Sequence, residues 1–174
     1  MSGIVSKDLV RAIKDQFQIN WQGIHGLSHL SRVWENGIHL AEATGANKKV
    51  VQLFAVFHDS RRLNEDCDPE HGPRGALLAE SWRGKYYDLN DEEFDLLFTA
   101  CSLHTMARTH VDTTIQTCFD ADRLDLGRIG KKPDPKLLCT EAAKDTKTIE
   151  WATQRSISGY MPDNVLRMAG EFLE

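Results

Sequence analysis

Apolar residues recur along most of the chain at the three- and four-residue spacing of amphipathic α-helices. Ser6 suits the N-cap of a first helix, whose apolar face holds Leu9, Val10, Ile13 and Phe17. A second helix is predicted from about Ser28 to Thr44, with Gly45 placed to end it. A third, from about Asn47 to Arg62, is apolar on nearly all sides, so we expect it in the middle of the domain.

The pattern continues beyond a short polar segment. Pro73 suits the first position of a fourth helix, which carries Ala76, Leu77, Ala79 and Trp82 on its apolar positions. Asn90, with Glu93 three residues later, resembles a capping box. The fifth helix should therefore begin there and run to about Ala107.

A sixth helix is predicted over about Thr113 to Leu126, ending at Gly127. The segment from Gly127 to Pro135 is basic and contains Gly and Pro, which is typical of a flexible loop. Two further helices should follow, the later one starting near Pro162. Because no alternating pattern or internal repeat occurs, the sequence predicts an all-α bundle of about seven or eight helices.

Composition indicates an ordinary globular protein. A length of 174 residues fits one domain, and 41% hydrophobic with 27% charged residues argues against disorder. The formal net charge of −5 makes nucleic acid an improbable partner. The apolar helix faces could support a homodimer without identifying one.

Cellular location is predicted from what the chain lacks. It has no apolar run of about 18 residues that would span a membrane, and its first 17 residues lack the apolar centre of a signal peptide. The four cysteines form no C-x-x-C pair and no disulfide framework. We therefore expect a cytoplasmic protein with no membrane partner.

The seven histidines are the unusual feature of the composition. Four predicted helices direct a histidine or aspartate inward from an apolar face, and these residues are His29, His58 with Asp59, His104, and Asp122. Each alone is readily explained as a core polar group that has found a partner. All of them together would need many separate partners. One shared divalent cation would satisfy them at once, and imidazole with carboxylate suits Mn, Fe, Co, Ni or Zn.

The chain resembles the HD superfamily of metal-dependent phosphohydrolases. The resemblance rests on the segments HLSRVWENGIHLAE, LFAVFHDSRR, DPEHGPRGALLAE, ACSLHT and FDADRLDLGR. It covers residues 26–128, about three-fifths of the chain, and implies a single helical domain over 1–174. The helices of residues 135–174 would then pack on that motif-bearing core.

The resemblance implies a divalent metal ion held by His29, His58, Asp59 and Asp122. Asp122 is preferred to Asp120 because the family's ligand directly precedes a basic residue, here Arg123. Asp125 is expected to orient a ligand or to cap the helix. The metal could be Mn, Fe, Co, Ni, Zn or Mg, with one or two ions bound.

His71 and His104 match positions where many relatives carry further histidines, which hold a second metal, contact phosphate or supply acid catalysis. For each, the alternative is a structural hydrogen bond. His25 is close to the site in sequence but matches no firm family position. His39 and His110 are expected at the surface.

Three arginines are candidate phosphate contacts: Arg61, Arg62 and Arg123. A guanidinium can bind phosphate through two parallel hydrogen bonds, although an arginine at a helix end is often only solvated. Lys131 and Lys132 could close over an anion or simply face solvent.

These residues predict a metal-dependent phosphohydrolase that acts on a small phosphate ester or nucleotide through a metal-activated water. Asp59 would lie near the water, and His71 or His104 would assist the leaving group. Three alternatives stay open: a di-iron oxygenase of the same fold, a non-catalytic nucleotide-binding module, and a structural helical adaptor.

Overall fold

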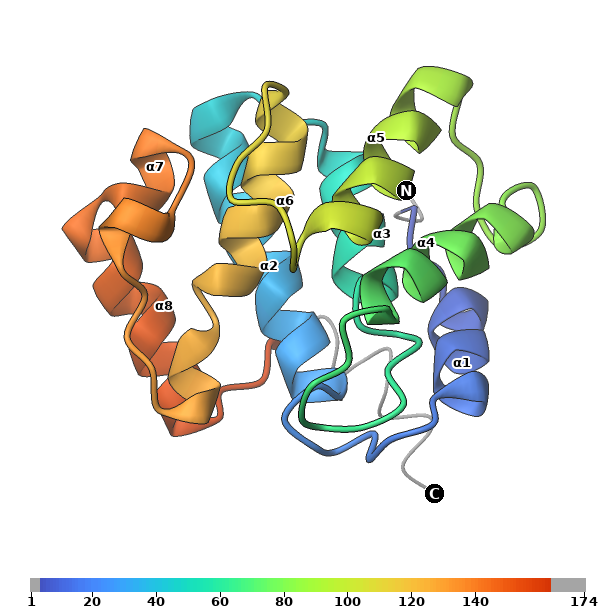
Figure 1. Ribbon diagram of the computed structural model, residues 1–174, viewed down its shortest axis with the longest axis horizontal. Coiled ribbons are helices and arrows are strands. Elements are labelled where there is room, and N and C mark those ends of the chain that lie inside the picture. Colours follow the sequence, from blue (N-terminus) through green and yellow to red (C-terminus); the bar gives the residue numbers. More distant parts are fainter. Residues whose placement is uncertain (1–3, 164–174) are drawn as a thin grey trace.

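The computed structural model describes residues 4–163, which contain eight α-helices and two short 3-10 helices joined by loops and turns (Figure 1). The α-helices are α1 (Lys7–Gln16), α2 (Leu27–Thr44), α3 (Lys48–Phe57), α4 (His71–Trp82), α5 (Asp91–Leu103), α6 (Thr113–Arg123), α7 (Glu141–Lys144) and α8 (Thr146–Ser158). The 3-10 helices are η1 (Leu126–Ile129) and η2 (Pro135–Leu137). The prediction of an all-α bundle of seven or eight helices is confirmed.

Several helix ends lie where local sequence signals place them. The Ser6 hydroxyl accepts a hydrogen bond from the Leu9 amide at the start of α1. Asn90 and Glu93 form both halves of a capping box at the start of α5. Gly45 ends α2 in the left-handed conformation, with φ at 75°.

Two predicted helices are shorter than expected. The third helix, α3, ends at Phe57 rather than near Arg62, because the Ser60 amide and hydroxyl both donate to the Phe57 carbonyl and turn the chain. Helix α5 ends at Leu103 rather than Ala107, where the Met106 amide donates to the Leu103 carbonyl only three residues back and the chain turns. Both early ends leave a histidine at the helix terminus.

The region after α6 also differs from the prediction. Helix α6 ends at Arg123, and Gly127 lies inside η1 instead of ending a helix. Gly127 is buried against α8, where a Cβ atom would lie 2.7 Å from the Cβ of Ser156. Helix α4 begins at His71, two residues before Pro73. The helix expected from near Pro162 lies outside the described residues.

The core surrounds α3, which lies at the centre of the bundle (Figure 1). Its fully buried side chains are Val50, Val51, Leu53, Phe54, Ala55 and Phe57. A smaller apolar cluster joins α7 and α8 to Leu40 of α2 and Leu124 beyond α6. Because apolar side chains cover α3 from several directions, any polar group at its end is removed from solvent.

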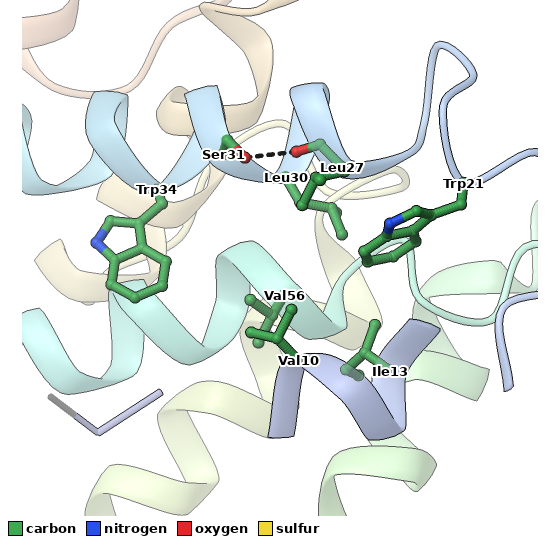
Figure 2. A pocket seen from close by; sticks show the side chains of 8 residues that line it. All are labelled: Val10, Ile13, Trp21, Leu27, Leu30, Ser31, Trp34 and Val56. Carbon is green, nitrogen blue, oxygen red and sulfur yellow. Dashed lines mark hydrogen bonds between the residues drawn. The ribbon is translucent and has the colours of Figure 1, made fainter. Parts of the chain in front are cut away.

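A small apolar hollow lies where α1, α2 and α3 meet (Figure 2). It measures about 20 Å³, and Trp21 and Trp34 stand on two sides of it. Ser31, the polar residue at its wall, donates its hydroxyl to the Leu27 carbonyl at 2.6 Å. The hollow therefore offers a ligand neither charge nor a free hydroxyl.

Within residues 4–163, no helix is both long and apolar enough to cross a membrane.

Candidate metal centre

Four buried histidines point their Nε2 atoms toward the same site, while each Nδ1 atom faces away from it. The Nδ1 atoms of His58 and His104 lie 3.1 and 2.8 Å from the carbonyls of Phe54 and Cys101. His71 Nδ1 contacts the Asp68 carbonyl, and His29 Nδ1 lies 2.8 Å from the Asp125 carboxylate. Each of these partners only accepts hydrogen bonds, so each Nδ1 carries the proton. When the rings are neutral, the four Nε2 lone pairs are left to face the interior of the site.

The first group of acceptors joins α2, the end of α3 and α6. His29 Nε2 lies 3.1 Å from His58 Nε2, 3.4 Å from Asp59 Oδ2 and 3.5 Å from Asp122 Oδ1. His58 Nε2 lies 3.7 and 3.8 Å from the same two carboxylate oxygens. Two ligand atoms of one ion, each bound at about 2.1 Å, lie about 3.0 to 3.4 Å apart in tetrahedral or octahedral geometry. His29, His58 and Asp59 therefore fit a divalent cation with small adjustments, and Asp122 lies beside both imidazole nitrogens as a further donor.

A second group shares Asp59 with the first. Asp59 Oδ1 lies 3.1 Å from His71 Nε2 and 3.9 Å from His104 Nε2, and the two imidazole nitrogens are 2.9 Å apart. The other oxygen of Asp59 belongs to the first group. His29, His58 and Asp59 lie within the spacing of a metal site, and so do Asp59, His71 and His104. Asp59 is thus placed as a carboxylate that could bridge two ions.

Burial and charge set the protonation of these groups. Burial lowers the pKa of His58 to about 3 and also lowers the pKa of His104, so both rings are neutral at pH 7. Burial acts to raise the pKa of Asp59 and Asp122, but neighbouring imidazoles outweigh it and hold both values below the usual range. Neutral imidazoles and ionised carboxylates are the forms that bind metal.

His29 differs from the other histidines in its pKa. Burial, the largest influence, acts to lower the pKa of His29, yet hydrogen bonds to Asp125 and Asp59 outweigh it and raise that pKa. A proton on His29 would neutralise part of the carboxylate charge when no cation is bound. A bound cation would therefore compete with the proton for this ring.

Asp125 orients the His29 ring through a hydrogen bond to Nδ1, the nitrogen that faces away from the cluster. Its carboxylate accepts from His29 Nδ1, from Arg32 Nε at 2.6 Å and from the Ser156 hydroxyl at 2.5 Å, and it is fully buried. Arg32 in turn donates to the Tyr160 carbonyl. Carboxylates behind ligating histidines fix the orientation of the ring and strengthen its basicity. Asp125 occupies the orienting place that the sequence suggested for it.

Two glycines bring α4 close to the neighbouring helices. A Cβ atom on Gly75 would lie 2.4 Å from the Phe57 carbonyl oxygen, at the end of α3. A Cβ atom on Gly72 would lie 2.5 Å from the Cys101 carbonyl oxygen on α5. Because neither has a side chain, His71 at the start of α4 reaches both Asp59 and His104.

The structure brings together His29, His58, Asp59, His71, His104 and Asp122. Asp120 points elsewhere: its carboxylate accepts from the Cys139 and Thr140 amides and the Thr140 hydroxyl. Asp120 therefore holds the segment before α7 against α6. His39 is exposed and its ring lies tilted against that of Trp151, while His110 is half-buried.

The three candidate arginines have different positions. Arg62 Nε lies 3.2 Å from Asp59 Oδ1, beside the cluster. Arg61 is directed to α1, where it donates to Gln16, because the chain has already left the α3 helix. Arg123 donates to the carbonyls of Ala107, Arg108 and Leu137. Neither Arg61 nor Arg123 is therefore brought to the cluster, and Lys131 and Lys132 are exposed.

Sequence reasoning missed three residues at the edge of the cluster. Arg128 Nη2 lies 4.0 Å from Asp122 Oδ1. The Thr105 hydroxyl lies 3.2 Å from His71 Nε2. Glu65 lies 2.6 Å from Nδ1 of His25, which is buried. Burial lowers the pKa of His25.

Only one of these residues carried a usable signal. Arg128 ends the motif-bearing segment, three residues after Asp125, a spacing that returns a side chain to the same face of a tight helix. Thr105 directly follows His104. Glu65 lies in an acidic, polar stretch that is typical of a solvated loop.

Comparison of the chain with protein-family models, with curated proteins and with solved structures gives no match.

Proposed function

We propose that this protein is a divalent-metal-dependent phosphohydrolase that acts on a small phosphate ester or nucleotide. The observation that carries the proposal is the convergence of His29, His58, Asp59 and Asp122. The two Nε2 atoms lie 3.1 Å apart, and each has its ring proton on the opposite nitrogen. Two such acceptors beside two carboxylates repel one another, and a cation between them removes that repulsion.

The second group supports a site for two ions. Asp59 offers one oxygen to the pair His29 and His58 and the other to the pair His71 and His104. When bound, divalent ions lower the pKa of a water ligand and polarise a phosphoryl oxygen. The chain's own contribution is to hold the donors in place before any substrate arrives.

Arginines at the edge of the cluster favour a phosphate substrate. Arg62 lies beside Asp59, and Arg128 lies beside Asp122. Guanidinium groups bind phosphate oxygens and offset the charge that spreads over them during transfer. The Asp122 side chain is 21% exposed, whereas those of the other five cluster residues are at most 3% exposed. Substrate would therefore approach from the side of Asp122 and Arg128.

The same donors also suit a di-iron oxygenase, which is the alternative that the shared Asp59 carboxylate favours. Metal analysis and a comparison of turnover with and without oxygen separate the two functions. Hydrolysis proceeds without oxygen, and an oxygenase does not. Tight nucleotide binding with no product on long incubation would instead indicate a non-catalytic binding module.

The test of the proposed function is a metal-supplemented screen against nucleoside mono-, di- and triphosphates and generic phosphodiesters. We expect at least one class to be hydrolysed, with dependence on Mn, Fe, Co, Ni, Zn or Mg. Replacing His58 or Asp122 by alanine should abolish turnover together with bound metal, because each substitution removes a donor of the first group.

His39→Ala is the matched control, since His39 is an exposed histidine on the same helix as His29. It should leave turnover unchanged. Equal activity in the wild type and in the His58 and Asp122 variants would contradict the proposal. We also propose a reducing compartment such as the cytoplasm, because the four cysteines are free and two of them are buried.

A further inference from the structure

A hollow of about 380 Å³ lies beside the cluster, between the segment after α5, the end of α6 and the segment before α7. Its apolar walls are Met106, Ala107, Leu126, Pro133, Leu137 and Leu138. Small-molecule sites typically have this size and are lined mainly by apolar groups with a few polar ones.

Two wall residues connect the hollow to the cluster. Thr105 lines the hollow and also contacts His71 Nε2 at 3.2 Å. Leu126 lines it as well, and it directly follows Asp125, one helical turn after Asp122. The hollow therefore adjoins the second group of donors at Thr105, and Leu126 is the chain neighbour of Asp125, which accepts from His29 of the first group.

The polar groups of the hollow already serve to build it. Arg123 donates to the carbonyls of Ala107, Arg108 and Leu137, so one guanidinium ties the two flanking segments together. Arg108 donates to the Lys136 carbonyl, and Asp134 accepts from the Lys136 amide. What the walls offer a ligand is mainly apolar surface.

We propose that this hollow receives the organic group of the phosphate ester, and that it selects a flat apolar ring over a short alkyl group. The proposal rests on the proposed function, because the phosphate is taken to bind at the metal cluster. Apolar burial would supply the selectivity, since removing a ring from water is favourable in proportion to its area.

The test compares two probes that share the phosphate and differ in the organic group. Phenyl phosphate and methyl phosphate are titrated against the protein supplied with Mn²⁺, and their dissociation constants are measured by calorimetry. We expect phenyl phosphate to bind at least tenfold more tightly. Equal constants, or no measurable binding of phenyl phosphate, would overturn the proposal.

Variants locate the selectivity. Leu137 is 50% exposed at the hollow, and Leu77 is 56% exposed on α4, away from it. Leu137→Ala should reduce the preference for phenyl phosphate about fivefold, whereas Leu77→Ala should retain it. Met106→Ala, at a wall residue that is 73% exposed, repeats the test at a second position. Unchanged preference in both wall variants would place the ring elsewhere and overturn the proposal.

Turnover separates this inference from the proposed function. Suppose that no ester is hydrolysed, but the protein still binds phenyl phosphate more tightly than methyl phosphate and the wall variants lose this preference. The proposed function then fails, and the role proposed for the hollow stands. If both esters are hydrolysed but their dissociation constants are equal, the proposed function stands and the role proposed for the hollow fails.

Discussion

At the scale of single residues, the site depends on which nitrogen of each histidine carries the proton. Backbone carbonyls fix this for His58, His71 and His104, and the Asp125 carboxylate fixes it for His29. A side chain therefore does for His29 what a backbone carbonyl does for the others. Asp125 is the one orienting group among the four that a substitution can remove.

Asp125→Asn tests that arrangement. An amide cannot replace a carboxylate that accepts from His29, Arg32 and Ser156, and it leaves the buried Arg32 without its anion. We expect a loss of about 3 kcal/mol in the free energy of unfolding. Divalent-ion affinity should fall by about 10- to 100-fold, because the His29 ring loses its support.

Urea unfolding and metal titration measure the two effects. Asp95→Asn, at an exposed position on α5, is the control and should change neither quantity. A stable Asp125→Asn variant with normal ion affinity would show that His29 is held by packing alone.

Asp125 also predicts how stability depends on pH. Burial acts to raise its pKa, but hydrogen bonds to His29 and Arg32 outweigh it and lower the pKa to about 2. Because the folded pKa is below the unfolded value of about 3.9, the ionised group stabilises the fold above pH 4. That contribution, about 2 kcal/mol, should be lost as the pH falls from about 4 to about 2.

The measurement is urea unfolding of the metal-free wild type and Asp125→Asn across that range. The difference in stability between them should shrink as the pH falls. A difference that stays constant from pH 4 to pH 2 would contradict the role given to Asp125.

At the scale of helices, the site is made where α3 stops. The Ser60 turn ends α3 at Phe57, and His58 and Asp59 follow at once, still surrounded by the core. Helix α4 then approaches the same point through Gly75. The distance between these two helices decides whether His71 reaches Asp59.

Gly75→Ala should separate the two helices. The new Cβ atom would lie 2.4 Å from the Phe57 carbonyl oxygen, which is backbone and cannot turn aside. We expect destabilisation by about 1 to 2 kcal/mol, although alanine usually favours a helix over glycine. Ion binding by the second group should weaken because His71 moves away from Asp59.

Thermal unfolding and metal titration provide the readout. Glu80→Ala, an exposed substitution on the same helix, should leave both unchanged. Unaltered ion binding in Gly75→Ala would mean that α4 does not set the second group.

At the scale of the whole molecule, the sequence predicted the helices better than their ends. Periodic apolar positions and caps such as Asn90 located the bundle, because these signals are local. Gly127 was misread as a helix end, since its reason for being glycine is contact with Ser156 on α8, far along the chain. The early end of α3 at Phe57 carried no signal of comparable strength.

The candidate site shows the same division. Residues in motifs, such as His58 and Asp122, were named from the sequence and lie together. Arg61 and Arg123 were named with them but serve α1 and backbone carbonyls, because a side chain's direction depends on where its helix ends. Long-range partners such as Glu65 could not be found, since only the fold brings that residue to His25.

The central claim is that the cluster is a metal centre, and the most direct test is the number of ions bound per chain. The protein is stripped with a chelator, equilibrated with Mn²⁺, desalted and analysed for metal and protein. We predict one or two ions per chain in the wild type. His104→Ala should keep the ion of the first group, and His58→Ala should lose it. Wild-type protein that retains no ion, or a His58→Ala variant with wild-type content, would contradict the account.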